Sequence, residues 1–383
     1  MSKVLVITPQ IKPGGGPPGY VFNLMRGIDE LEVCSQVINK FTFKGELNPD
    51  RSKSTLDPSV FFKIRKYLVS SLKKLGLKKF LSFKNRELRK LMDKNDLVIF
   101  QGYQDIDLMK YALKKKILTV YMPHSPTPAS DEYRMLAELS DDIEFKEELY
   151  FLYERNEEYL IKNANFVVFP TKNSKTEYKK YQIYLEKKIV YIKSGVFIDN
   201  KFNGTSEVNA AIKVAFIGRF VSHKGYDIFC EAAKLYSNNY NNQFVNFYTV
   251  GEGPMIYKYP ELINLGWRSD VFDIISGVDI IVIPNRVSYF DLLPIECAAL
   301  GKPLIMTKVG GSIDQLNDLI DSIAFEELTP ESLMNAMVEA IKIKKMNPNW
   351  GINNKLAYER LYTTKSFASR WDLAVTQMIN NSA

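Results

Sequence analysis

The feature that most constrains this chain is a repeated alternation of short β-rich runs with amphipathic helical stretches. Such alternation is typical of a parallel sheet flanked by helices. In the first half the β-rich runs are KVLVITP (3–9), DLVIFQG (96–102), KILTVYMPH (116–124), NFVVFPT (165–171) and KIVYIKSGV (188–196). In the second half they are IKVAFIGRF (212–220), VNFYTVGEGP (245–254), ELINLGW (261–267), VDIIVIPN (278–285), KPLIMTK (302–308) and SIAFE (322–326). The pattern predicts an α/β protein with two tandem Rossmann-like domains.

The boundary between these domains is expected in the turn-rich segment FIDNKFNGTSEVN (197–209). A chain of 383 residues is also long for a single hydrophobic core. We therefore expect an N-terminal domain over residues 1–196, completed by an amphipathic C-terminal helix over 365–383, and a C-terminal domain over 197–364. Ligands of such sheets lie at the carboxyl ends of the strands, which are expected to face a cleft between the domains.

Composition and terminal sequence bound the location of the protein. Hydrophobic residues make up 46% and charged residues 25% of the chain, which excludes wholesale disorder. Its three cysteines, Cys34, Cys230 and Cys297, lack metal-like spacing and are expected to be buried thiols in a reducing compartment. The chain starts directly with a strand, without a signal-peptide pattern, and no apolar run approaches the about 20 residues that span a bilayer. We expect a cytoplasmic protein.

A basic stretch runs from Val60 to Lys90 and contains eleven Lys or Arg residues and one acid. Its charges alternate with Phe, Leu, Ile and Val at helix-like spacing, as in a basic amphipathic surface. Two interpretations remain open: a solvated face of an ordinary helix pair, or attachment to an anionic membrane surface or an anionic acceptor. Nucleic acid is not an expected partner, because no recognised binding motif accompanies the charge.

The segment VAFIGRFVSHKGYDIF (214–229) combines a strand with a glycine and two cations. The strand ends at Gly218, Arg219 follows, and Lys224 precedes the start of a helix. Glycine lets the backbone approach a ligand, and two cations five residues apart suit a pair of phosphates beside a helix N-terminus. The motif alone is only moderately specific, because an Arg and a Lys on one loop are often merely solvated.

The segment RVSYFDLLPIECAALGKPLI (286–305) contains a lone glutamate, Glu296, inside an apolar run. A carboxylate buried in a core helix would be costly without a partner. Glu296 is therefore expected to face a cleft and hold a ligand.

The order of the motifs GRFVSHKG, VGEGP, INLGWRSDVFDIISGVDIIVIPN, FDLLPIECAALGKPLI and VGG resembles the group-4 family of retaining, nucleotide-sugar-dependent glycosyltransferases with the GT-B fold. The first half is similar to this family through PGGGPPGY after the first strand, a histidine after a later strand, NANFVVFPTKNSK and IKSGVF. The closing SFASRW is similar to the family's returning helix. The resemblance covers nearly the whole chain, and its most specific motifs lie in residues 214–312.

The resemblance implies roles for residues of the second half. Arg219 and Lys224 match the pair that grips the donor diphosphate, on which charge develops as the glycosidic bond breaks. Glu296 matches the glutamate that accepts hydrogen bonds from the ribose hydroxyls, a task that suits a carboxylate. The backbone expected close to the donor is that of Gly218, Leu292 and Leu293.

In the first half, the resemblance implies that Gly15 and Gly16, with Gly14, let a loop approach the donor, although these glycines could simply form a turn. His124 matches the family's histidine near the donor sugar. There it would hydrogen-bond hydroxyls or help to neutralise the oxocarbenium-like transition state. A purely structural histidine is the alternative.

This sequence departs from the family pattern at two positions. The family usually has two glutamates eight positions apart, but eight positions before Glu296 stands Ser288. Asp291 replaces the glycine that normally follows the phenylalanine. Asp291 either supplies the missing sugar-binding carboxylate from a shifted position or caps the following helix, for which Asp is favoured.

The expected function is that of a retaining, hexosyltransferase-type enzyme. It would move a sugar from a nucleoside diphosphate sugar to a hydroxyl of a glycan or lipid-linked glycan in bacterial surface polysaccharide or lipopolysaccharide biosynthesis. The donor is a substrate, and neither a cofactor nor a metal ion is expected. Two alternatives remain: a non-catalytic glycan-binding or partner subunit, and a nucleotide-sugar epimerase of the same fold, whose carboxylate and histidine set is not apparent. The basic stretch adds an expected peripheral location at the inner face of the cell membrane.

Overall fold

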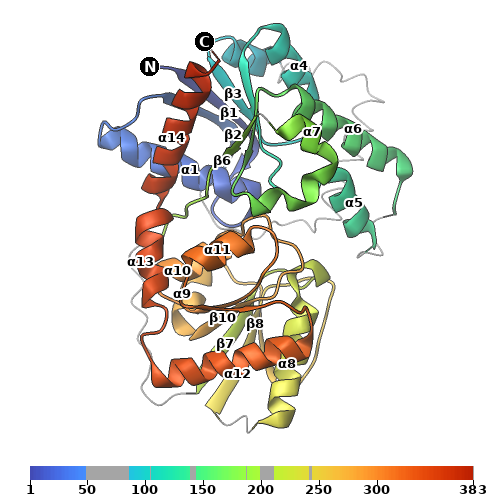
Figure 1. Cartoon of the computed structure of the whole chain (residues 1–383), viewed down its shortest axis with the longest axis vertical. Helices are drawn as coiled ribbons and strands as arrows, with labels where there is room; N and C mark the ends of the chain where they lie inside the picture. Colours follow the sequence, from blue (N-terminus) through green and yellow to red (C-terminus); the bar gives the residue numbers. More distant parts are fainter. Residues whose placement is uncertain are drawn as a thin grey trace. The chain divides into compact units, whose positions relative to one another are not determined.

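The computed structural model of the chain describes residues 1–48, 86–103, 105–138, 144–186, 188–198, 211–240 and 244–382. The chain divides into two compact units, and each contains one parallel sheet with helices beside it (Figure 1). Unit 1 comprises Met1–Phe169, Glu177–Ile192 and Ala368–Ala383, and unit 2 comprises Pro170–Thr176 and Lys193–Phe367. The predicted α/β class with two Rossmann-like sheets is confirmed.

Unit 1 contains a six-stranded parallel sheet in the order β2-β1-β3-β4-β5-β6. Its strands are β1 (Lys3–Ile11), β2 (Lys40–Leu47), β3 (Leu97–Phe100), β4 (Leu118–Tyr121), β5 (Phe166–Phe169) and β6 (Ile189–Tyr191). The labelled helices and 3-10 segment that contribute to it are α1 (Gly16–Val33), α4 (Ile106–Lys114), α5 (Ala129–Glu138), α6 (Glu147–Asn163), η1 (Asn173–Tyr181), α7 (Gln182–Leu185) and α14 (Thr364–Asn380). Every residue of β3 is buried, as expected for a central strand covered on both faces.

Two elements of unit 1 differ from the sequence-based expectation. The edge strand β2 was not anticipated: Phe41, Phe43 and Leu47 alternate with polar residues or glycine, but of these residues only Phe41 is buried. The sequence pattern favours a helix that starts at about Tyr20, whereas α1 begins four residues earlier, at Gly16, with a proline in its first turn. Proline is favoured there because its missing N–H would be unpaired in any case.

The C-terminal helix α14 packs against unit 1 through buried polar contacts. The indole Nε1 of Trp371, which is fully buried, donates a hydrogen bond to the Tyr20 hydroxyl at 2.8 Å. The Asp372 carboxylate accepts hydrogen bonds from the backbone N–H groups of Ile38 and Asn39 at 2.8 and 2.9 Å. These contacts join the last helix to α1 and to the start of β2, so both ends of the chain belong to unit 1 (Figure 1).

Unit 2 contains a second six-stranded parallel sheet in the order β12-β11-β10-β7-β8-β9. Its strands are β7 (Ile212–Ile217), β8 (Val245–Val250), β9 (Leu262–Gly266), β10 (Ile280–Ile283), β11 (Leu304–Thr307) and β12 (Ser322–Phe325). Its helices are η2 (Ser222–Lys224), α8 (Tyr226–Asn239), α9 (Val271–Gly277), α10 (Leu292–Ala299), α11 (Ser312–Asp318), α12 (Pro330–Met346) and α13 (Ile352–Leu361).

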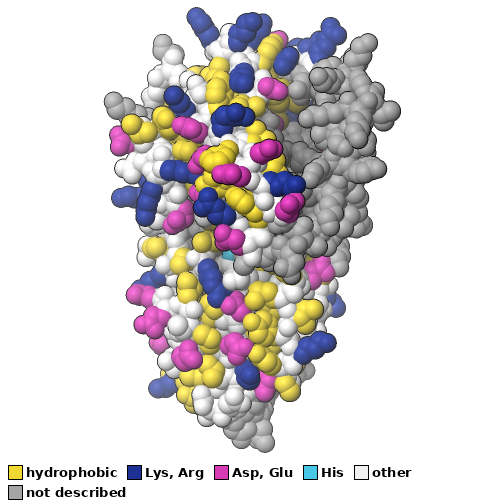
Figure 2. Space-filling view, turned by 90° about the vertical axis from the view of Figure 1, so that its right-hand side faces the viewer, with side chains coloured by type: hydrophobic (Ala, Val, Ile, Leu, Met, Phe, Trp, Pro, Cys, Tyr) yellow, Lys and Arg dark blue, Asp and Glu magenta, His cyan; other side chains and the backbone are white. Residues whose placement is uncertain are grey.

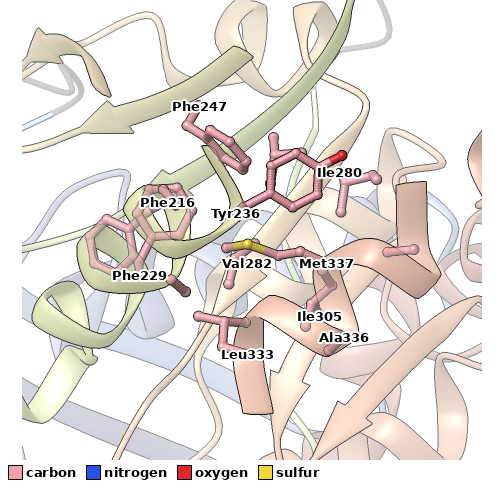
Figure 3. Packing of buried hydrophobic residues seen from close by; sticks show 14 of the residues in the cluster. Phe216, Phe229, Tyr236, Phe247, Ile280, Val282, Ile305, Leu333, Ala336 and Met337 are labelled. Carbon is pink, nitrogen blue, oxygen red and sulfur yellow. The ribbon is translucent and has the colours of Figure 1, made fainter. Parts of the chain in front are cut away.

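A hydrophobic cluster fixes α8 and α12 on this sheet (Figure 3). Phe229 of α8 and Met337 of α12 are fully buried beside Phe216, Phe247 and Val282 of the strands. Burial of large side chains stabilises such a core by about 1.5–3 kcal/mol each. The cluster therefore gives the loops at the strand ends a rigid base.

The described residues contain neither a metal-binding cluster nor a membrane-spanning helix. No group of three or more His, Cys, Asp or Glu residues gathers there as a metal site, and no helix among them is long and apolar enough to cross a membrane. Cys230 and Cys297 are buried as expected, but Cys34 is exposed because it follows the last turn of α1. On the face seen in Figure 2, cationic and anionic side chains are interspersed. Most of the basic stretch, residues 60–85, lies outside the described residues.

Candidate functional site

The sheet of unit 2 has a topological switch point between β7 and β10. The chain runs from β7 to β8 and β9 on one side and then crosses to β10 on the other side of β7. β7 and β10 pair in parallel, with Phe216 opposite Val282, so their carboxyl ends lie next to each other. Open α/β sheets bind ligands at such a point. The loop after β7 carries Arg219 and Lys224, and the loop after β10 leads to Asp291.

Glycines let these loops pack closely. Gly225 has a φ of 68°, and a Cβ at this position would lie 1.9 Å from the carbonyl oxygen of Pro284, after β10. A Cβ at Gly251, after β8, would lie 1.8 Å from the carbonyl oxygen of Gly218. Only glycine permits both approaches. The backbone N–H of Gly218 donates to the Val250 carbonyl at 2.9 Å, so this N–H is not available to a ligand.

Arg219 is exposed, and a buried histidine orients it. Its Nη2 lies 3.1 Å from Nε2 of His223. Because a guanidinium group can only donate, Nε2 of His223 accepts, and we assign the ring proton to Nδ1. Burial, together with the charges of Arg219 and Lys224, lowers the pKa of His223 to about 4. His223 is thus a neutral acceptor that orients Arg219 without cancelling its charge.

Lys224 and Asp291 form an ion pair across the switch point. Lys224 Nζ lies 2.5 Å from Asp291 Oδ2, and Asn285 Nδ2 donates to the same oxygen at 2.6 Å. Burial acts to raise the pKa of Asp291, but Lys224 and the hydrogen bond from Asn285 outweigh it and hold this pKa below its usual range. Asp291 is therefore ionised at neutral pH, and Lys224 has an internal counter-ion.

Asp291 stands at the N-cap position of α10, but its side chain makes no capping hydrogen bond. Its backbone carbonyl accepts a hydrogen bond from Gln315 Nε2 at 2.7 Å, which fixes the start of the helix by another route. Among the described residues, hydrogen bonds reach only Oδ2 of the carboxylate. The geometry thus favours a binding role over a capping role and leaves Oδ1 for a ligand.

The other predicted residues of this segment lie in and before α10. Glu296 lies within α10 and is only 5% exposed. Leu292 is buried and Leu293 is half-buried, directly after Asp291. Ser288 is 3% exposed, and its hydroxyl has no hydrogen-bond partner among the described residues.

Unit 1 brings the predicted His124 to helix α1. The His124 ring meets the ring of Tyr20 edge-on at 4.8 Å between centroids, and Tyr20 lies one turn into α1. Gly15 and Gly16 are exposed at the N-terminus of this helix, whose first turn carries no acid. Removal from water lowers the pKa of His124 to about 3, so the imidazole is neutral near pH 7. The residue also has a φ of 56°, which is uncommon for a residue other than glycine.

Several residues that the sequence did not single out support the site of unit 2. Arg286 binds the Asp227 carboxylate with both terminal nitrogens, at 2.7 and 2.6 Å, and also donates to the Ser222 carbonyl at 2.5 Å. Its backbone N–H donates to the carbonyl of His223 at 3.0 Å. Arg286 thus ties the loop after β10 to the loop after β7. Nothing in the sequence distinguishes it from a solvated arginine, because its partner lies 59 residues away.

A further polar residue was also missed in unit 1. Gln101 directly follows β3, is 5% exposed, and has neither its amide nitrogen nor its amide oxygen hydrogen-bonded among the described residues. Buried amides without partners are rare in folded proteins. No motif in the sequence marked this glutamine.

Comparison with known proteins places this site in context. Residues 211–342 match the family model "Glycosyl transferases group 1". An uncharacterized glycosyltransferase of Methanocaldococcus jannaschii is 26% identical over 213 residues, which are 51% of this chain and 58% of that protein. The UDP-Gal:alpha-D-GlcNAc-diphosphoundecaprenol alpha-1,3-galactosyltransferase of Escherichia coli is 29% identical over 143 residues, 34% of this chain and 37% of that protein. The chain thus spans less than two thirds of the length of these curated relatives.

Similar solved structures cover the whole chain at low sequence identity. The Anabaena protein Alr3699/HepE in complex with UDP has a TM-score of 0.64 at 13% identity and covers 98% of this chain and 100% of its own. The sucrose-phosphate synthase of Thermosynechococcus elongatus has a TM-score of 0.67 at 13% identity and covers 100% of both chains.

These similarities define the class of the protein by its fold, which is GT-B, as the sequence predicted. Within the chain, the segment that matches the group 1 glycosyltransferases contains Arg219, Lys224, Asp291 and Glu296. The predicted resemblance to a family of GT-B glycosyltransferases is confirmed.

The ion pair between Lys224 and Asp291 predicts coupled effects on stability. Lys224→Gln and Asp291→Asn should each lower the melting temperature slightly, because a partly exposed pair contributes about 0–1 kcal/mol. The double variant should lose no more than the larger single loss, and both losses should shrink in high salt. Thermal unfolding at low and high salt measures this. Thr329→Ala is the control, since Thr329 caps α12 through the Ser332 N–H at 3.2 Å and its loss should not depend on salt. Additive losses at positions 224 and 291 would contradict the pairing.

Proposed function

We propose that this protein is a retaining glycosyltransferase of the hexosyltransferase type. It moves a sugar from a nucleoside diphosphate sugar to a hydroxyl of a glycan or lipid-linked glycan in bacterial surface polysaccharide biosynthesis. The observation that carries the proposal is the convergence of Arg219, Lys224 and Asp291 at the switch point between β7 and β10.

The donor diphosphate would bind to Arg219 and Lys224. Both cations follow β7, and the loop between them lies beside a helix N-terminus, which favours anions. When the glycosidic bond breaks, negative charge grows on the leaving diphosphate, and cations already held in place stabilise this charge with little reorganisation. In this proposal the two side chains do what a metal ion does in other transferases, and the enzyme needs no metal or cofactor.

Asp291 would bind the transferred sugar. Lys224 and Asn285 hold its Oδ2, which leaves Oδ1 to accept a hydrogen bond from a sugar hydroxyl. A hydrogen bond to a charged acceptor contributes about 1.5–3 kcal/mol. Lys224 would then contact both the carboxylate and the diphosphate, so that one cation links the recognition of the sugar to that of the leaving group.

The remaining predicted residues have supporting roles in this proposal. A neutral His124 can donate or accept a hydrogen bond with a sugar hydroxyl and, unlike an imidazolium, does not repel the positive charge that grows on the sugar. Gly15 and Gly16 leave room for the donor at the start of α1. Glu296 would accept from the ribose hydroxyls. The configuration at the anomeric carbon would be retained, because the acceptor hydroxyl attacks the same face of the sugar from which the phosphate departs. The departing phosphate would assist this attack.

The names of similar proteins support the choice of substrates. The Anabaena protein Alr3699/HepE has been crystallised with UDP and glucose, which favours a UDP-sugar donor. The Escherichia coli relative acts on a diphosphoundecaprenol-linked sugar, and so does an alpha-1,3-N-acetylgalactosaminyltransferase of Campylobacter jejuni, which is 23% identical over 174 residues, 42% of this chain and 45% of that protein. We therefore propose a lipid-linked glycan as the acceptor.

Removal of either cation should abolish most of the activity. Arg219→Ala and Lys224→Ala should each lower the transfer rate by about 100- to 1000-fold, as for the loss of one preorganised donor to a developing anion. UDP release from a panel of UDP-sugars, with and without a lipid-linked acceptor, measures this. Lys234→Ala on α8 is the control and should behave like the parent, because Lys234 lies over the Tyr259 ring at 4.4 Å. Parent-like turnover of either cation variant would refute the assignment, and tight UDP binding without transfer would indicate a non-catalytic subunit.

Asp291→Asn should separate donor binding from transfer. Removal of a negative charge beside Lys224 should make UDP bind a few-fold more tightly, whereas loss of the charged acceptor should slow transfer tenfold or more. Calorimetric titration with UDP and a transfer assay measure the two effects. Ser288→Ala is the control and should change both much less. Unchanged turnover per folded Asp291→Asn molecule would show that other groups recognise the sugar.

We further propose that the basic stretch 60–90 brings the enzyme to the inner face of the cell membrane. Basic residues near an anionic surface contribute about 1 kcal/mol each, and this attraction weakens with salt. Replacement of Lys73, Lys74, Lys78 and Lys79 by Gln should therefore reduce co-sedimentation with anionic liposomes at low salt. Equal sedimentation of the parent and the variant would leave the stretch as a solvated face.

A further inference from the structure

Glu157 on helix α6 is the most deeply buried acid of the described residues, and the proposed reaction does not use it. It is 1% exposed. Its Oε1 accepts a hydrogen bond from the Tyr121 hydroxyl at 3.1 Å, and its Oε2 accepts one from the backbone N–H of Ala129 at 2.7 Å. A buried carboxylate is costly, so its retention requires an explanation.

The two partners of Glu157 lie at the two ends of the segment that carries His124. Tyr121 is the last residue of β4, and Ala129 is the first residue of α5. One carboxylate therefore ties both ends of residues 122–128. The hydroxyl of Tyr178 contacts the same segment from η1, at 3.1 Å from the Ser125 carbonyl and 3.0 Å from the Thr127 carbonyl.

His124 needs such support because its backbone conformation is unfavourable. A non-glycine residue at a φ of 56° costs free energy and persists only when its surroundings hold it. The contact between the His124 and Tyr20 rings fixes the side chain but not the backbone. The ties from Glu157 and Tyr178 supply the backbone constraint.

We infer that Glu157 is a positioning residue for His124, and that its negative charge holds residues 122–128 in the conformation used for sugar transfer. The inference rests on the proposed function only in assigning a sugar contact to His124. A charged acceptor forms hydrogen bonds roughly twice as strong as those of a neutral one. Protonation of Glu157 would leave one oxygen occupied by its own hydrogen and would weaken the tie to Ala129.

The groups around Glu157 leave its charge sensitive to pH near neutrality. Burial raises the pKa of Glu157 to about 7, although the hydrogen bonds from Ala129 and Tyr121 and the charge of Lys180 act in the opposite direction. The charge of Glu132, on α5, adds slightly to the rise. Lys180 lowers this pKa only in part, since its Nζ also lies 3.0 Å from Glu154 Oε1 and 3.2 Å from Asp131 Oδ2.

The raised pKa has a defined effect on stability. The folded protein binds the Glu157 proton more tightly than the unfolded chain does, because the pKa is about 7 in the folded protein and the ordinary value for a solvated glutamate is 4.5. This contribution is present at low pH and is lost as the pH rises from about 4.5 to about 7. Glu157→Gln, which is always neutral and nearly isosteric, should therefore remove that pH dependence. It should melt at a similar temperature to the parent at pH 5 and at a higher temperature at pH 8.

The test compares Glu157→Gln with the parent in stability, hydrogen exchange and transfer. Transfer by the parent should rise between pH 6 and pH 8, whereas Glu157→Gln should be about tenfold slower at pH 8 and nearly flat over this range. Amide hydrogen exchange in peptides covering residues 122–132 should be faster in the variant at pH 8. Glu158→Gln is the matched control on the same helix. Within the described residues, the only side-chain hydrogen bond of Glu158 comes from the Tyr184 hydroxyl, at 3.1 Å. A variant that is more stable but less active cannot be explained by a structural role.

The readouts separate this inference from the proposed function. If the parent transfers no sugar, the proposed function fails, while hydrogen exchange and the pH dependence of melting still test the tie made by Glu157. Parent-like exchange in residues 122–132 of Glu157→Gln would overturn the inference. So would a transfer rate and pH profile of this variant that match those of an active parent.

Discussion

The parallel pairing of β7 with β10 is the constraint on which the site of unit 2 depends. It sets two strand ends side by side although 62 residues separate Ile212–Ile217 from Ile280–Ile283 in the chain. The loops that follow these two strands carry charged side chains close to one another, so like charges would repel and opposite charges can pair. Here they pair twice, through Lys224 with Asp291 and through Arg286 with Asp227. Close packing at Gly225 keeps both pairs within hydrogen-bond distance.

Two carboxylates show how differently the fold treats the same chemical group. Asp291 is partly exposed, touches a lysine, and has a pKa below its usual range. Glu157 is almost fully buried, receives hydrogen bonds from neutral donors, and has a pKa of about 7. The first is suited to meet a ligand as a permanent anion, because solvent and Lys224 stabilise its charge. The second is suited to fix residues 122–128 through hydrogen bonds at both ends of this segment. Its burial makes the strength of these hydrogen bonds depend on pH.

Sequence patterns were sufficient for the fold, and they drew attention to Arg219 and Lys224, but they did not reveal which side chains these cations contact. Strongly apolar strands such as β3 and β10 were recognised because both faces are buried, whereas the edge strand β2 was missed because little of it is buried. The loop with Arg219 and Lys224 was marked by its glycines and by its place after a strand. Side-chain pairing over long sequence separations, as between Arg286 and Asp227, leaves no local pattern. The same holds for the role of His223, whose burial is a property of the folded loop.

In the proposed function, the charge balance at the switch point connects the departure at Asp291 to the binding of a diphosphate. Arg219 keeps its full charge because its neighbour, His223, is neutral, whereas Lys224 shares its charge with Asp291. Two cations and one anion leave a net charge of about +1 before a ligand arrives, less than a diphosphate could use. The carboxylate therefore weakens the attraction for a free diphosphate and is useful only if a sugar hydroxyl also binds it. An intact sugar donor satisfies both requirements, whereas the nucleoside diphosphate product satisfies only one. If the proposed function holds, an aspartate in place of a glycine would lower the affinity for the product relative to the donor and so favour release after each transfer.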